Sequence, residues 1–134
     1  MSQSFQWPVR VYYEDTDAGG VVYHSQYLNF MERARTEWLR AKGFEQDELA
    51  DGEGVVFVVR RVEVDFRRAA RFNDALTVSV ELLEQRRTNL TLQQRIRREA
   101  DDELLIEGRV QVACVDVDGF RPRRIPEAIA REMV

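Results

Sequence analysis

The sequence predicts an α+β domain in which one long helix packs against a five-stranded antiparallel sheet. Apolar residues recur at helical spacing between about residues 25 and 43. From Gly54 onward they instead alternate with polar residues at the period of two that is typical of strands. The order of elements is one strand, one helix and four further strands. We therefore expect the sheet to wrap around the helix.

The long helix is predicted to begin at Ser25 or Gln26, with Ser25 as N-cap, and to end before Gly43 as the C′ residue. A helix with so many large apolar groups needs an extended surface to cover it. Short helical turns are expected over residues 45–51 and after Pro126, which is placed at the first helical position. The apolar face of the long helix comprises Tyr27, Leu28, Phe30, Met31, Ala34, Trp38 and Leu39.

The first strand is predicted to start after Pro8 and to carry Val9, Val11 and Tyr13 on one face. The run 55–59 is wholly apolar, which is typical of a strand buried on both faces, and alternation continues from it through residue 66. Because that run is poorly suited to an exposed edge, we expect it to pair with itself across a two-fold axis. Three more strands follow from alternation over residues 76–82, 90–96 and 104–114, with turns near 71–74, 86–89, 101–102 and 118–119.

Composition narrows the class of protein. The 134 residues are expected to form a single domain over residues 1–134, with 44% hydrophobic and 33% charged residues. The net charge of −4 argues against nucleic acid as a partner. No apolar run approaches the ~20 residues of a membrane span, and no signal peptide is recognisable, so a cytoplasmic location is expected. Cys114 alone cannot form an internal disulfide and is expected in the core, and with one histidine and one cysteine no metal or cofactor is predicted.

The loop before the long helix holds the candidate catalytic groups. Ten residues just before the helix N-terminus contain two acids, two glycines and the histidine: Asp15, Asp17, Gly19, Gly20 and His24. A carboxylate beside free helix N–H groups can activate a nucleophile while the N–H groups bind developing negative charge. Asp17 could instead cap its own turn, and the glycines could serve the turn or allow close approach of a ligand carbonyl. Asp15 is expected to be the structural partner of Asp17.

The run VRVYYEDTDAGGVVYHSQYLNFMERARTEWL, with its D-x-D-x-x-G-x-V-Y-H pattern, resembles the signature of hotdog-fold acyl-CoA thioesterases of the 4-hydroxybenzoyl-CoA thioesterase family. Within that family it is most similar to the Tol–Pal-associated acyl-CoA thioesterase group. The resemblance continues through FVVRRVEVDFRRAARFNDAL, the QRR turn and RVQVACVDVDGFRPRRIP. It implies a hotdog fold, thioester hydrolysis of acyl-CoA, dimers with a continuous sheet that often form tetramers, and active sites at the dimer interface.

The resemblance also implies roles for particular residues. It assigns the catalytic carboxylate to Asp17 and implicates His24 and Tyr13, while backbone N–H groups at about residues 23–25 would polarise the thioester carbonyl. Arg86 and Arg87 would bind the phosphates of coenzyme A, and Asn89 is placed where such relatives carry a hydroxyl residue. The residues themselves leave other roles open: Tyr13 as a packing residue, His24 as a structural one, and the arginine pair as a solvated turn.

The sequence leaves two alternatives to this function. One is a non-catalytic scaffold at the inner membrane that binds acyl groups or acyl carrier protein; the other is a hotdog dehydratase or hydratase. Asp17 and His24 favour hydrolysis over the scaffold, and the loop fits the dehydratase poorly. The sequence leaves open whether Asp17 is a general base or a nucleophile, the acyl length, and dimer versus tetramer. It also leaves open any position peripheral to the inner membrane.

Overall fold

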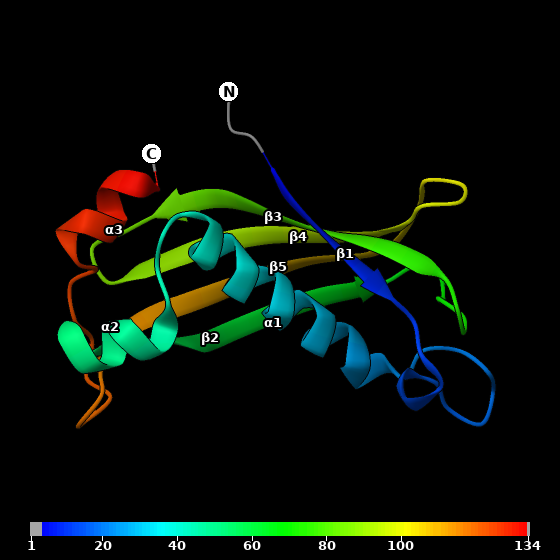
Figure 1. The fold of residues 1–134 in the computed structure, drawn as a ribbon, viewed down its shortest axis with the longest axis horizontal. Coiled ribbons are helices and arrows are strands. Elements are labelled where there is room, and N and C mark those ends of the chain that lie inside the picture. The colour runs from blue at the N-terminus through cyan, green and yellow to red at the C-terminus, as the bar shows by residue number, and fades with distance from the viewer. Residues whose placement is uncertain (1–3, 134) are drawn as a thin grey trace.

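The computed structural model describes residues 4–133 and has the predicted α+β architecture. A single antiparallel sheet has the strand order β1-β3-β4-β5-β2, and the long helix α1 lies across one face of it (Figure 1). Helices α2 and α3 lie at one end of the sheet, and the loop that leads into α1 lies at the other (Figure 1). The elements are β1 (Phe5–Arg10), the 3-10 turn η1 (Tyr13–Asp15), α1 (His24–Ala41), α2 (Gln46–Gly52), β2 (Val55–Phe66), β3 (Ala75–Gln85), β4 (Asn89–Arg98), β5 (Glu103–Asp116) and α3 (Glu127–Glu132).

Helix α1 begins at His24, slightly earlier than predicted. The N-cap is Tyr23, without a side-chain cap, so the prediction of Ser25 as N-cap is wrong. The start is fixed from outside the helix, because the N–H of Tyr23 donates to the carbonyl oxygen of Asp15 at 2.9 Å. Leu28 is 39% exposed and does not belong to the buried face. The residues of α1 that are buried are Tyr27, Phe30, Met31, Ala34, Trp38 and Leu39.

The other end of α1 follows the prediction. Gly43 has a φ of +95°, which a residue with a side chain adopts only with strain. Its N–H donates to Arg40 at 2.9 Å, and the N–H of Phe44 donates to Leu39 at 3.0 Å. This pair of bonds is the Schellman motif, with Gly43 at C′.

Strand β1 ends before the predicted strand does, so the placement of Tyr13 on it is wrong. Tyr13 lies in η1, where a carboxylate oxygen of Asp15 accepts the N–H of Tyr12 at 2.8 Å. Such a local side-chain bond gives the backbone an alternative to the sheet ladder. Pro8 lies inside β1 opposite Thr77, not before the strand, and is tolerated because β1 is an edge strand.

Strand β2 forms the other edge of the sheet, so the run 55–59 is not buried on both faces within one chain. A register shift between Val59 and Arg61 keeps its apolar side chains on the face toward α1, in line with buried residues of β5. The helix does not cover this edge: Val59 is 47% exposed, Val62 40% and Phe66 50%. We call these three residues the apolar stripe.

The remaining predictions concern the C-terminal half. Strands β3, β4 and β5 and the turns between them follow the predicted alternation. Pro126 is the N-cap of α3, whereas the prediction placed it at N1, so the helix begins one residue later than predicted. Cys114 is fully buried, and burial raises the pKa of its thiol, which agrees with an inert core residue. Over residues 4–133 none of the helices is both long and apolar enough to cross a bilayer.

Candidate active site

The loop between η1 and α1 is held in a narrow closed shape. The N–H of Asp17 donates to Val21 at 2.9 Å, and the N–H of Gly20 donates to Asp17 at 3.0 Å. Gly20 has a φ of +79°, a backbone conformation that favours glycine. The N–H of Val22 donates to the carbonyl oxygen of Ala70 at 2.9 Å, which ties the loop to the segment after β2.

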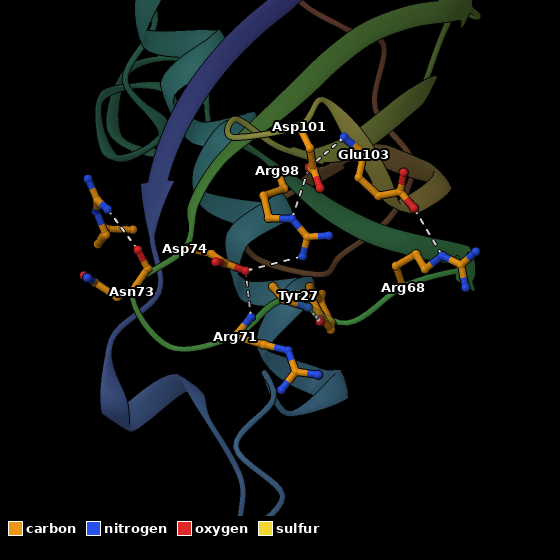
Figure 2. Close-up of polar contacts among 10 residues, drawn as sticks. Tyr27, Arg68, Arg71, Asn73, Asp74, Arg98, Asp101 and Glu103 are labelled. Atoms are coloured by element: carbon orange, nitrogen blue, oxygen red, sulfur yellow. Dashed lines mark hydrogen bonds and ion pairs between the residues drawn. The ribbon is translucent and has the colours of Figure 1, made fainter.

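That segment is itself fixed by polar contacts from three directions (Figure 2). The hydroxyl of Tyr27, on α1, accepts the N–H of Ala70 at 2.9 Å. The carboxylate of Asp74 accepts the N–H of Arg71 at 2.9 Å and lies 3.7 Å from the guanidinium of Arg98 on β4. The loop is therefore anchored to both the helix and the sheet.

Asp15 has the structural role that the sequence predicts. It is 5% exposed, and both of its carboxylate oxygens are engaged. Oδ2 accepts the N–H of Tyr12 at 2.8 Å, and Oδ1 accepts the side-chain amide of Gln26 at 2.7 Å. These bonds hold η1 against the first turn of α1.

Replacing Asp15 by Ala is expected to lower the free energy of unfolding by about 3 kcal/mol, because two hydrogen bonds to a buried charged group are lost. Urea unfolding followed by circular dichroism measures the change. Asp51→Ala, at an exposed position in α2, is the matched control and should stay close to wild type. A loss below about 1 kcal/mol in Asp15→Ala would contradict the structural role.

Asp17 is exposed, and only one of its two carboxylate oxygens is hydrogen-bonded within residues 4–133. Its Oδ1 accepts the N–H of Gly19 at 2.8 Å, whereas Oδ2 has no hydrogen-bond partner among residues 4–133. A side chain on Gly19 would bring its Cβ to 3.2 Å from Oδ1, so glycine suits this close approach. Asp17 therefore caps its own turn and still presents one oxygen that can accept a proton.

The first turn of α1 offers two free N–H groups, fewer than predicted. The N–H of Tyr23 is bonded to Asp15, and that of Gln26 donates to Tyr23 at 2.9 Å. The N–H groups of His24 and Ser25 have no acceptor within the described part of the chain. The prediction of donors at about residues 23–25 therefore narrows to these two.

The negative charge of Asp17 acts on the same turn of the helix. Burial raises the pKa of Tyr27, and the negative charges of Asp74 and Asp17 add to the rise. The N–H of Asp17 donates to Val21, two residues before the N-cap Tyr23, so the backbone of Asp17 lies next to the segment that enters α1. An acidic group and a helix N-terminus thus share one small region, which suits a developing anion.

His24 and Tyr13 lie near this region without bonding to Asp17 among the described residues. The His24 ring is exposed, and its centroid lies 4.6 Å from that of Tyr23 and 6.4 Å from that of Phe66. Tyr13 is 75% exposed and stacks on Phe72 with centroids 3.9 Å apart. Both rings are held by aromatic neighbours.

The predicted phosphate-binding residues lie in the turn between β3 and β4. Arg86 and Arg87 are exposed; Arg86 forms an ion pair with Glu84 at 2.8 Å. Asn89 opens β4, and its Oδ1 accepts from the Gln111 side chain at 3.4 Å. The residue directly after the arginine pair is Thr88, so a hydroxyl residue follows the pair and Asn89 comes one position later.

One chain does not bring this turn to Asp17. Asn89 aligns with Ala113, which aligns with Val58, whereas the His24 ring lies beside Phe66 at the other end of β2. Strand positions eight residues apart are separated by roughly 26 Å. The predicted catalytic and phosphate-binding residues therefore occupy opposite ends of the sheet.

The sequence reasoning missed Gln26, Tyr27 and Ala70 as supports of the site. Their partners lie at separations of 11 and 43 residues, which no local spacing reveals. The one usable signal was the polar Gln26 in the first turn of an otherwise apolar face, beside an acidic loop.

The sheet wrapped on one helix, with an acidic loop at the helix mouth, defines a hotdog thioesterase. The chain belongs to the thioesterase-like superfamily, whose family profile matches residues 11–133. Acyl-CoA thioester hydrolase YbgC of Escherichia coli O6:H1 is 50% identical over 128 residues, covering 96% of this chain and 94% of the relative. Acyl-CoA thioesterase YbgC of Haemophilus influenzae is 43% identical over 129 residues, covering 96% and 93%. These comparisons confirm the predicted family.

Solved structures agree with the fold. A probable thioesterase from Bartonella henselae matches with a TM-score of 0.85 at 37% identity, covering 94% of this chain and 100% of that one. A 1,4-dihydroxy-2-naphthoyl-CoA thioesterase from Synechocystis matches with a TM-score of 0.90 at 20% identity, covering 98% and 96%. The second likeness shows a shared fold only.

Proposed function

We infer that this protein is an acyl-CoA thioesterase, in which Asp17 activates the attacking group at the open N-terminus of α1. The observation that carries this is the unengaged oxygen of Asp17 in a loop whose backbone pairs Asp17 with Val21, directly ahead of the free N–H groups of α1. The names of the YbgC relatives support acyl-CoA as the substrate.

Thioester hydrolysis needs only the few groups that this site offers. Asp17 accepts a proton from water as the water oxygen attacks the thioester carbonyl carbon. The oxyanion is bound by the N–H groups of His24 and Ser25, each worth roughly 3–4 kcal/mol in comparable sites. The carbon–sulfur bond then breaks and coenzyme A leaves as a thiolate. Because a thiol has a pKa of about 8.5, the leaving group needs little acid assistance.

The same geometry allows Asp17 to attack the carbonyl directly and form a mixed anhydride that water then hydrolyses. Repeated turnover in ¹⁸O-labelled water tests this route, because label enters the Asp17 carboxylate when water attacks the aspartyl carbonyl of the anhydride, and never when water attacks the thioester directly. His24, exposed at the helix start, is the group placed to carry protons between the site and solvent.

The active enzyme is proposed to be a dimer in which β2 pairs with β2 of a second copy. The other edge strand, β1, is short and interrupted by Pro8, which blocks strand pairing. Strand β2 has 12 residues without proline, and the apolar stripe lies exposed along it. Two-fold antiparallel pairing would continue the sheet and cover the stripe.

This dimer also accounts for the separated site residues. Antiparallel pairing over the length of β2 places Phe66 of one chain near the start of β2 in the other. Asp17 of one chain then lies at the same end as the partner's Arg86 and the partner's Arg87. Arginine pairs bind phosphate by charge-assisted hydrogen bonds, so these two would hold the nucleotide of coenzyme A while Asn89 and Tyr13 border the site.

Release of free thiol from a panel of acyl-CoA thioesters, from short aliphatic and benzoyl to long-chain, tests the function. We expect hydrolysis of at least part of the panel at rates that depend on acyl length. A matching thioester of acyl carrier protein shows whether that protein also delivers substrate. Binding without thiol release throughout the panel would contradict the enzyme and support the scaffold.

A further inference from the structure

A cavity of about 180 Å³ lies between α1 and the sheet, on the side of the β2 edge. Its floor consists of Leu90, Leu92 and Val112, and Phe57 and Val59 border it from β2. Its wall on α1 carries two charged side chains, Arg35 and the exposed Glu32. The cavity is therefore apolar below and charged on one side.

Arg35 is held in this wall by a buried amide. Its Nη1 donates to Oε1 of Gln94 at 3.0 Å. Gln94 is fully buried on β4, and its Nε2 donates to the carbonyl oxygen of Met31 at 3.0 Å. Both ends of the Gln94 amide are thus engaged, so its oxygen is fixed toward the guanidinium.

Arg35 is charged and partly buried. Burial lowers the pKa of Arg35, and the negative charge of Glu32 acts against this. Within residues 4–133 no carboxylate forms an ion pair with it, and Glu32 instead accepts from Thr36 at 3.3 Å. A partly desolvated cation is costly unless a polar or anionic group completes its surroundings. A guanidinium has five N–H donors, and only one of those in Arg35 is engaged here.

On the basis of the proposed thioesterase function, we propose that this cavity binds a short acyl group whose far end carries an oxygen acceptor. Arg35 donates its unengaged N–H groups to that oxygen, and the apolar floor packs against the methylenes between it and the thioester. A carboxylate is preferred over a hydroxyl, because charge-assisted hydrogen bonds are stronger. The volume corresponds to about six groups the size of a water molecule, which suits a short chain.

The cavity serves the catalytic loop of the other chain. Arg35 lies eleven residues along α1 from His24, about 16 Å, which is too far for a short acyl group held at its own helix start. Phe57 and Val59, at the mouth, lie near the start of β2, where the proposed pairing brings the partner's Phe66. The thioester carbonyl at the partner's Asp17 therefore faces this cavity.

Matched pairs of substrates test the proposal. Glutaryl-CoA and 5-methylhexanoyl-CoA have the same shape, with a carboxylate in one and an isopropyl group in the other. We expect wild type to favour glutaryl-CoA in kcat/KM, and Arg35→Met to reduce that preference at least tenfold, mainly by a loss on glutaryl-CoA. Arg35→Lys keeps a cation and should keep part of the preference. A preference reduced less than tenfold in Arg35→Met would overturn the assignment.

Control variants separate binding from folding. Arg35→Met leaves the amide oxygen of Gln94 unpaired, so Arg35→Met combined with Gln94→Leu removes both partners of that bond and should show the same loss of preference. Arg33→Met, at an exposed position of α1, should leave the preference unchanged. If wild type hydrolyses glutaryl-CoA and 5-methylhexanoyl-CoA with equal kcat/KM, the cavity assignment is wrong but the thioesterase function stands. Failure to hydrolyse every thioester overturns the proposed function, and this proposal with it.

Discussion

Replacing Asp17 by Asn is expected to lower kcat by about a thousandfold, within the range that general bases contribute. The amide oxygen can still accept the N–H of Gly19, so the turn keeps its capping bond. The amide has no basic oxygen, and so it can neither take a proton from water nor attack the carbonyl. Initial rates of thiol release on a hydrolysed acyl-CoA measure the effect.

The fold should survive this change. Urea unfolding of Asp17→Asn is expected to stay within about 1 kcal/mol of wild type, because the substituted group is exposed. Asp47→Asn, an exposed acid on α2 at the other end of the sheet, is the matched control and should hydrolyse normally. A folded Asp17→Asn with a kcat within threefold of wild type would remove Asp17 from the chemistry.

Replacing Val62 by Asp is expected to convert the proposed dimer to monomers and to abolish hydrolysis. Val62 is 40% exposed in the single chain, so a carboxylate there leaves the fold of that chain intact. In the proposed dimer the exposed 40% of this side chain is buried twice by symmetry, and losing both burials costs about 2 kcal/mol, or about thirtyfold in association. The cost of burying two like charges at the pairing adds to this loss.

Sedimentation and thiol release measured at the same concentrations check this expectation. Val62→Thr keeps the β-branched shape without a charge and should remain dimeric and active. A Val62→Asp protein that stays dimeric with normal turnover would place the interface elsewhere. A monomer with normal turnover would show that the site is complete within one chain.

Most of the fold was predictable because periodicity and turn chemistry are local. The alternation through β3, β4 and β5 and the glycine at the end of α1 depend on near neighbours alone. The wrong predictions concern the start of α1 and the end of β1, which contacts outside the element itself determine. The carbonyl of Asp15 sets the start of α1 ahead of Ser25, and the alternation through Val11 and Tyr13 continues past the strand into a turn that Asp15 closes.

The site was predictable to a similar extent. The different roles of Asp15 and Asp17 follow from the fold and not from their spacing, because η1 and Gln26 engage both oxygens of Asp15. The bonds from Gln26 to Asp15 and from Arg35 to Gln94 join elements that only the folded chain brings together. The distance between Asp17 and the arginine turn likewise depends on the registers of β4, β5 and β2, which a sequence does not give.

Mixing two inactive variants tests the site shared between subunits most directly. One variant carries Asp17→Asn, and the other carries Arg86→Ala with Arg87→Ala, each assayed at substrate concentrations below KM. After subunit exchange half of the dimers are mixed, and each mixed dimer has one site with both sets of groups intact. We therefore expect about a quarter of wild-type activity from an equal mixture. Activity no higher than the mean of the two separate variants would contradict a site built from Asp17 of one chain and the arginines of the other.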